Sequence, residues 1–158
     1  MTYWRFAAMI ITSTVIMYGL MYLNSWDFSH VWYSQTRTWM AVYMGAVMAI
    51  VMLAFMLGMY TNRNINIGIF VGATVVFGLS LYLVRSQDTV GDVAWMKAMI
   101  PHHSIAILTS SRANIKDPRV RKLADEIIKA QELEIKEMEA LIADIGGGPK
   151  ATPAIDGK

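Results

Sequence analysis

Two stretches of the sequence, around residues 96–103 and 131–138, combine side chains that bind soft metal ions. The residues that could act as ligands are Met96, Met99, His102, His103, Glu134 and Met138. Thioether sulfur favours Cu(I), whereas imidazole suits copper, zinc, iron or nickel. Met99 and His102 have the i, i+3 spacing of the Glu-x-x-His element of di-iron bundles, with Met in place of Glu. This soft replacement argues against di-iron chemistry and favours copper, with Cu(I) preferred and Cu(II) possible.

The first stretch lies on a predicted helix over residues 89–113. Apolar and small residues recur there at helical spacing. Thr89 and Asp92 resemble an N-terminal capping box, although Asp replaces the usual Glu or Gln. Pro101 lies inside the pattern, and we expect it to kink the helix rather than end it, because the periodicity continues beyond it.

The second stretch lies on a predicted helix that begins at Pro118 and ends near Ile145. Asp117 is a suitable N-cap, and proline is favoured at the first helical position. Gly146–Gly148 would terminate this helix, and the tail over residues 146–158 has no periodicity, so we expect it to be disordered.

Both helices show a seam of residues at alternating three- and four-residue steps. The seams are Asp92, Met96, Met99, His103, Ala106, Ser110 and Ala113 on the first helix, and Val120, Ala124, Ile127, Gln131, Glu134, Met138, Leu141 and Ile145 on the second. Folding the hairpin about residue 116 places Gln131 and Glu134 opposite the Met/His part of the first seam. Buried polar groups need partners, so this coincidence predicts a site. The alternative is ordinary packing, with the methionines as core residues and the histidines as a hydrogen-bonded interface pair.

The N-terminal half has a different composition. The 158 residues are 55% hydrophobic and only 16% charged, below the roughly 25% of soluble proteins. Between Phe6 and Val84 the only charged residues are Asp27, Arg37 and Arg63. This imbalance excludes a single globular domain and indicates a membrane protein with a charged C-terminal domain.

Three apolar runs, 6–23, 40–60 and 67–84, are each long enough to cross a hydrocarbon core of about 30 Å. We therefore expect a three-helix transmembrane region over residues 1–87, with an uncleaved first helix, followed by the hairpin over 88–145. The loops on the two sides of the membrane carry nearly equal numbers of basic residues. They give a weak preference for a cytoplasmic N-terminus and a hairpin outside.

Small residues mark packing faces in these runs. Ala41, Gly45 and Ala49 repeat at four-residue spacing, and Gly68 and Gly72 form a G-x-x-x-G pattern. The contacts could lie within one three-helix unit or between subunits.

The second run also carries a row of methionines, namely Met40, Met44, Met48, Met52 and Met56. Flexible apolar filling explains this row better than a copper-conducting ladder, because no ionisable residue accompanies it.

Other function classes have little support. The chain has no cysteine, its net charge of +2 is too small to imply nucleic-acid binding, and phosphate-binding motifs are absent. Ser104 follows His103, but adjacent residues on a helix point apart and cannot form a nucleophile–base pair. We therefore expect a binding protein and not an enzyme.

The hairpin carries a family resemblance. D-x-x-W-M-x-x-M-x-x-H-H-x-x-A-I over residues 92–107 and L-A-x-x-I-I-x-x-Q-x-x-E-I-x-x-M over residues 123–138 resemble the family named domain of unknown function 305. The resemblance covers roughly residues 88–145, and the N-terminal half is similar to that of membrane-anchored members. It implies a ferritin-like helical bundle, and some members are periplasmic or extracellular copper-binding proteins linked to copper tolerance.

The resemblance also implies a set of ligands. Met96, Met99, His102, His103 and Met138 match ligand positions, while Gln131 and Glu134 match motif positions of less defined role. Many members contain two hairpins and this chain has one. A lone hairpin has too little core to be stable, so we expect a homo-oligomer, most simply a dimer, that completes a four-helix bundle.

These observations predict a copper-binding protein of the inner or plasma membrane. Its periplasmic or extracytoplasmic hairpin would capture copper, buffer it or hand it on to a copper pump or chaperone, and so contribute to copper homeostasis. Besides lipid and metal, the expected partner is a second copy. The alternative is a non-catalytic assembly module whose hairpin only oligomerises.

Overall fold

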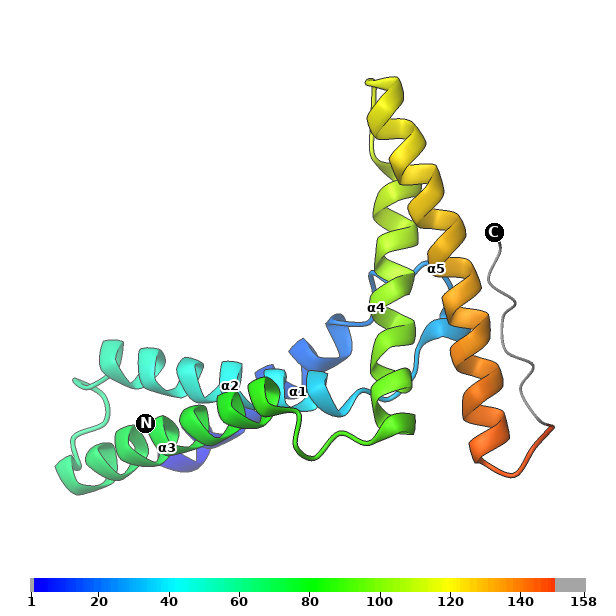
Figure 1. Cartoon of the computed structure of the whole chain (residues 1–158). Helices are drawn as coiled ribbons and strands as arrows, with labels where there is room; N and C mark the ends of the chain where they lie inside the picture. Colours follow the sequence, from blue (N-terminus) through cyan, green and yellow to red (C-terminus); the bar gives the residue numbers. More distant parts are fainter. Residues whose placement is uncertain (1, 150–158) are drawn as a thin grey trace. The chain divides into compact units, whose positions relative to one another are not determined.

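The computed structural model describes residues 2–149, and these residues are helical with no strand, which confirms the all-α prediction. The elements are α1 (Tyr3–Leu20), the 3₁₀ helix η1 (Phe28–His30), α2 (Gln35–Phe55), α3 (Arg63–Ser86), α4 (Asp92–Arg112) and α5 (Pro118–Ile145) (Figure 1). They form two compact units, one with α1, α2 and α3, and one with α4, α5 and the segment 22–34.

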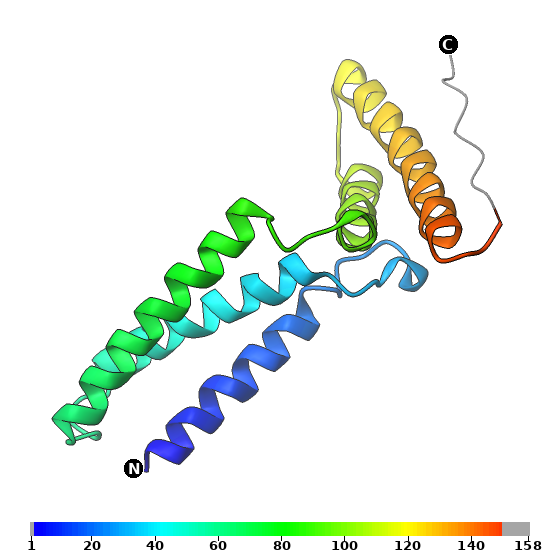
Figure 2. The ribbon, with the colours of Figure 1, turned by 60° about the horizontal axis from the view of Figure 1, so that its bottom comes forward.

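In the first unit α2 packs between α1 and α3 (Figure 2). The apolar runs account for α2 and α3, which are both long and apolar enough to cross a membrane. Only 22% of the most apolar window of α2 and 6% of that of α3 is buried, whereas an apolar core helix of a soluble protein is mostly buried. The helix α1, which holds the first predicted span, is not among the helices that meet this criterion, so the three-helix transmembrane region stays a prediction. Its 18 residues begin with Tyr3, Trp4 and Arg5, which lower its mean hydropathy.

Polar groups close both ends of this unit. The Tyr3 hydroxyl donates to Asn66 Oδ1 at 2.8 Å, and Asn66 Nδ2 donates to the Tyr60 carbonyl at 2.7 Å. At the other end of α1, Arg37 Nη1 donates to the Met21 carbonyl at 2.7 Å. Residues from both ends of α1 thus find partners at opposite ends of α2 and α3, so α1 runs along the full length of the unit.

The small residues of α2 face α1. Ala41, Gly45 and Ala49 are buried, and a Cβ on Gly45 would overlap the side chain of Thr14. A Cβ on Gly72 would meet nothing within 4 Å. The small-residue pattern around Gly45 therefore forms a helix contact within the unit. The G-x-x-x-G pattern that contains Gly72 lies on a face that the described part of the chain leaves uncovered.

In the second unit α4 and α5 form the predicted antiparallel hairpin (Figure 1). The helix α4 continues through Pro101. The predicted capping box is wrong, because Gly91 is the N-cap of α4 and the Thr89 hydroxyl accepts from Gln35 Nε2 instead.

The start and end of α5 agree with the sequence analysis. Asp117 Oδ1 accepts from the Arg119 backbone N–H at 2.8 Å, and Pro118 is the first helical residue. The Arg119 side chain also lowers the pKa of the Asp117 carboxyl, which keeps this cap ionised at neutral pH. Residues 146–149 form a turn with Gly147 at a φ of 85°, and the rest of the predicted tail lies outside the described residues.

The contact at Gly45 generates a prediction about the first unit. Gly45→Ala should destabilise the unit by about 1–3 kcal/mol, because the new methyl group overlaps the β-branched Thr14 side chain. Unfolding in detergent, followed by circular dichroism, measures the effect.

Gly72→Ala is the matched control, since it brings the same gain in helix propensity without the overlap. Equal stability of the two variants would contradict the α1–α2 contact. Addition of Thr14→Ala to Gly45→Ala should restore most of the loss.

Candidate metal centre

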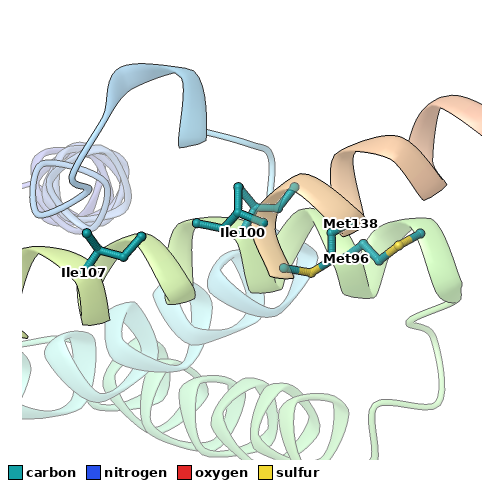
Figure 3. Packing of buried hydrophobic residues seen from close by; sticks show 5 residues of the cluster. Met96, Ile100, Ile107 and Met138 are labelled. Atoms are coloured by element: carbon teal, nitrogen blue, oxygen red, sulfur yellow. The ribbon is translucent and has the colours of Figure 1, made fainter. Parts of the chain in front are cut away.

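The interface between α4 and α5 contains a small apolar cluster that includes two of the predicted ligands (Figure 3). Its buried members are Met96, Ile100, Ile107, Ile135 and Met138. Met96 from α4 and Met138 from α5 are 4% and 6% exposed and belong to this cluster. Met99 is partly buried and packs against the same cluster. Three thioether side chains, from two helices, therefore converge on one short stretch of the hairpin.

A polar pair borders this cluster. His103 Nε2 lies 2.7 Å from Glu134 Oε2, and His103 Nδ1 lies 2.9 Å from the Met99 carbonyl oxygen. Gln131 Nε2 donates to the same Glu134 oxygen at 3.3 Å. His103 is buried, whereas the Glu134 side chain is half exposed. The predicted coincidence of the polar breaks in α5 with the Met/His part of α4 is thus present in the fold.

His103 makes one contact through each ring nitrogen. Nδ1 lies against the Met99 carbonyl oxygen, which ties the ring to its own helix, and Nε2 lies against the Glu134 carboxylate of α5. A metal ion bound at Nε2 would take the place of the contact with Glu134.

His102 is placed differently from the other predicted ligands. It is exposed on α4, and its ring centroid is 6.3 Å from that of His103 with the rings nearly perpendicular. The structure therefore brings together Met96, Met99, Met138, His103 and Glu134, and leaves His102 outside the cluster. Among residues 2–149, no group of three or more His, Asp or Glu side chains could hold a metal ion.

The face of α5 that packs on α4 is rotated from the predicted seam. Ala124, Ile128, Ile135, Met138 and Ile142 face α4, whereas Val120, Ile127, Leu141 and Ile145 are exposed. The predicted fold about residue 116 placed Gln131 and Glu134 opposite the Met/His part of α4, and Glu134 is the partner of His103 in the structure. The rotation follows from the burial of Ile128, Ile135 and Ile142, which repeat every seven residues.

The sequence analysis missed the segment 22–34, which packs on the hairpin. The Ser104 hydroxyl is fully buried; it accepts from the Trp26 backbone N–H at 2.7 Å and lies 3.0 Å from His30 Nδ1. Trp32 packs against the apolar cluster that contains Met96 and Met138, called the methionine cluster below. The Lys97 ammonium lies 5.7 Å from the centroid of the Trp32 ring. The only signal in the sequence was the aromatic content of this segment, which is equally typical of a membrane interface.

An open cavity of about 440 Å³ lies between this segment and the hairpin. Its wall includes Asp27, Glu132 and Glu139 as well as Lys136, and it reaches the cluster at Ile135. Three carboxylates against one ammonium make the cavity attractive to cations.

Comparison with known proteins finds a family match, which lies over the hairpin. Residues 83–154 match the model of the family described as Domain of unknown function (DUF305). An uncharacterized protein of Acanthamoeba polyphaga mimivirus is 41% identical over 64 residues, which cover 39% of this chain and 42% of the viral protein. The chain thus matches less than half of the length of this relative. No solved structure matches. The family resemblance inferred from the hairpin motifs is therefore supported over residues 83–154, the part of the chain that holds α4 and α5.

Proposed function

We propose that this chain is a membrane-anchored copper-binding protein whose hairpin captures copper at the outer face of the membrane and buffers it or hands it on. The observation that carries the proposal is the convergence of Met96, Met99 and Met138 beside the His103–Glu134 pair. Thioether and imidazole together favour Cu(I), and His103 with Glu134 would serve Cu(II). The ion is cargo, to be passed to a copper pump or chaperone, and the protein is not an enzyme.

The flexibility of methionine supports this proposal. A Met side chain has three rotatable bonds, so its sulfur can turn toward an ion while its backbone stays in the helix. Ser104, the hydroxyl nearest to His103 in the sequence, is fully buried and bonded to the segment 22–34, so it offers no nucleophile.

The membrane anchor of the proposal comprises all three helices of the first unit. If α2 and α3 cross the bilayer, α1 must cross it too, because Tyr3 is bonded to Asn66 near the start of α3 and Met21 to Arg37 near the start of α2. The segment 22–34 and the hairpin then lie on the same side, in agreement with their packing against each other. We place this side in the periplasm or outside the cell, with the N-terminus in the cytoplasm and the anchor in the inner or plasma membrane.

A homo-oligomer is part of the proposal because α5 has a second apolar stripe. Its members are Val120, Leu123, Ile127, Leu141 and Ile145, with exposures from 36% to 58%. On an α-helix these residues lie within about 60° of one another, next to the face that packs on α4. A second hairpin on this stripe would complete a four-helix bundle and bury the apolar area that one hairpin leaves exposed. This stripe is also what the alternative, a pure assembly module, would require.

Copper analysis of the purified chain tests the ligands. The wild type should retain stoichiometric copper after Cu(I) loading, whereas the Met96→Leu/Met138→Leu double variant and His103→Asn should each lose most of it. The Met→Leu changes nearly conserve volume, so we expect them to cost less than about 1.5 kcal/mol of stability each.

Met59→Leu is the matched control, since Met59 is exposed and outside the hairpin. His102→Asn should retain copper if the exposed His102 is no ligand. Equal copper in all variants would discard these ligands, and no stoichiometric copper in the wild type would favour the assembly module.

Mass measurement in detergent tests the oligomer. The full chain should be a dimer or a larger oligomer, and Ile127→Lys with Leu141→Lys should shift it to the monomer, because two charges would be buried without partners. Lys129→Glu, at another exposed position of α5, should leave the mass unchanged. A monodisperse wild-type monomer would refute this assignment.

A further inference from the structure

Trp32 is held against the methionine cluster by the packing of the segment 22–34. Its partly buried side chain contacts the cluster that contains Met96 and Met138. Ser104 fixes the segment, through its bonds to the Trp26 backbone and the His30 ring. Trp26 itself lies beside α4, with the Arg112 guanidinium 5.8 Å from its ring centroid.

Packing against the cluster does not by itself explain why an indole occupies this position. The Trp32 Nε1 atom is buried and has no hydrogen-bond partner among the described residues. A buried donor without a partner is unfavourable, and a phenyl ring would cover the same cluster without one. The indole therefore needs a reason other than packing.

The π face of the Trp32 indole supplies such a reason. Indole is the aromatic ring that attracts cations most strongly, and the attraction grows when water is excluded. The Lys97 ammonium lies 5.7 Å from the Trp32 ring centroid, so the ring is within reach of a cation, and a copper ion on this face would take the place of the ammonium. The carboxylates of the adjacent cavity add to the same preference.

We propose that Trp32 is a further residue of the copper site, whose indole covers the methionine cluster, excludes water and stabilises a bound Cu(I) through its π face. This inference rests on the proposed function of the hairpin. It makes the loop between α1 and α2 part of the site, so that the site is assembled from three separate segments of the chain.

The test uses the full chain in detergent, loaded with Cu(I) under ascorbate and titrated with bathocuproine disulfonate, a chelator that becomes coloured with Cu(I). Trp32→Leu should release copper at about tenfold lower chelator concentration, which corresponds to about 1.4 kcal/mol. Trp32→Phe should fall between Trp32→Leu and the wild type. Trp95→Phe is the matched control, because Trp95 precedes Met96 but is exposed on α4, and it should behave as the wild type.

Two further measurements separate a role in the site from a role in folding. Copper should quench the fluorescence of the wild type and of Trp95→Phe, and quench the Trp32 variants much less. Without copper, Trp32→Phe should unfold near the temperature of the wild type, because removal of the unpaired N–H offsets the loss of ring volume and the weaker contact with Lys97. Weaker copper retention in a variant of equal stability can then only reflect the site.

The outcomes distinguish this inference from the proposed function. If the wild type binds copper and the Trp32 variants retain it equally, Trp32 has no role in the site and the proposed function stands. If the wild type binds no copper, the proposed function fails and this inference fails with it. If Trp32→Phe loses copper only because it unfolds, the role assigned to Trp32 is refuted.

Discussion

The register of the hairpin depends on the contact between His103 and Glu134. His103 is tied to its own helix through the Met99 carbonyl and to α5 through the Glu134 carboxylate. A shift of α5 by one residue would turn Glu134 by about 100° and leave a buried imidazole without its partner. This polar contact fits the same register that buries Ile128, Ile135 and Ile142, and in that register Met96 and Met138 belong to one cluster. The polar pair and the apolar face of α5 therefore bring the thioethers together.

Two helices share only one interface, so one side of α4 needs another cover. The segment 22–34 provides it, and Ser104 is the point of attachment because its buried hydroxyl can both accept from a backbone N–H and pair with a ring nitrogen. A larger apolar residue at this position would pack, but it would leave the Trp26 N–H without a partner. The Ser104 hydroxyl, which follows a histidine in the sequence as a nucleophile could, therefore holds the segment 22–34 against α4.

The sequence was sufficient to predict features that depend on local chemistry. The helical class, the Asp117 cap and the end of α5 at Gly146 follow from capping and from hydrophobic period. The buried cluster was predicted only in part, because Met96 and Met138 lie on the predicted seams and its three isoleucines do not. The face of α5 was not predictable, because Ile127–Ile128 and Leu141–Ile142 are apolar pairs that fit two faces equally well. Only the contacts of α4 decide between them. Gly91 replaced Thr89 as the N-cap because Thr89 bonds to Gln35, a residue that is distant in sequence.

Methionine has different consequences in the two units. Near the end of α2, Met52 and Met56 pack against the cluster that includes Phe6 and Tyr60, where flexible side chains are useful. In the hairpin Met96 and Met138 occupy the centre of a small core, where leucine would pack with a better defined conformation. A short two-helix core gains more from rigid side chains than an apolar helix whose surface is mostly exposed. Methionine at the centre of this core therefore lowers stability, and the cost is understandable if the sulfur atoms themselves are what the hairpin uses.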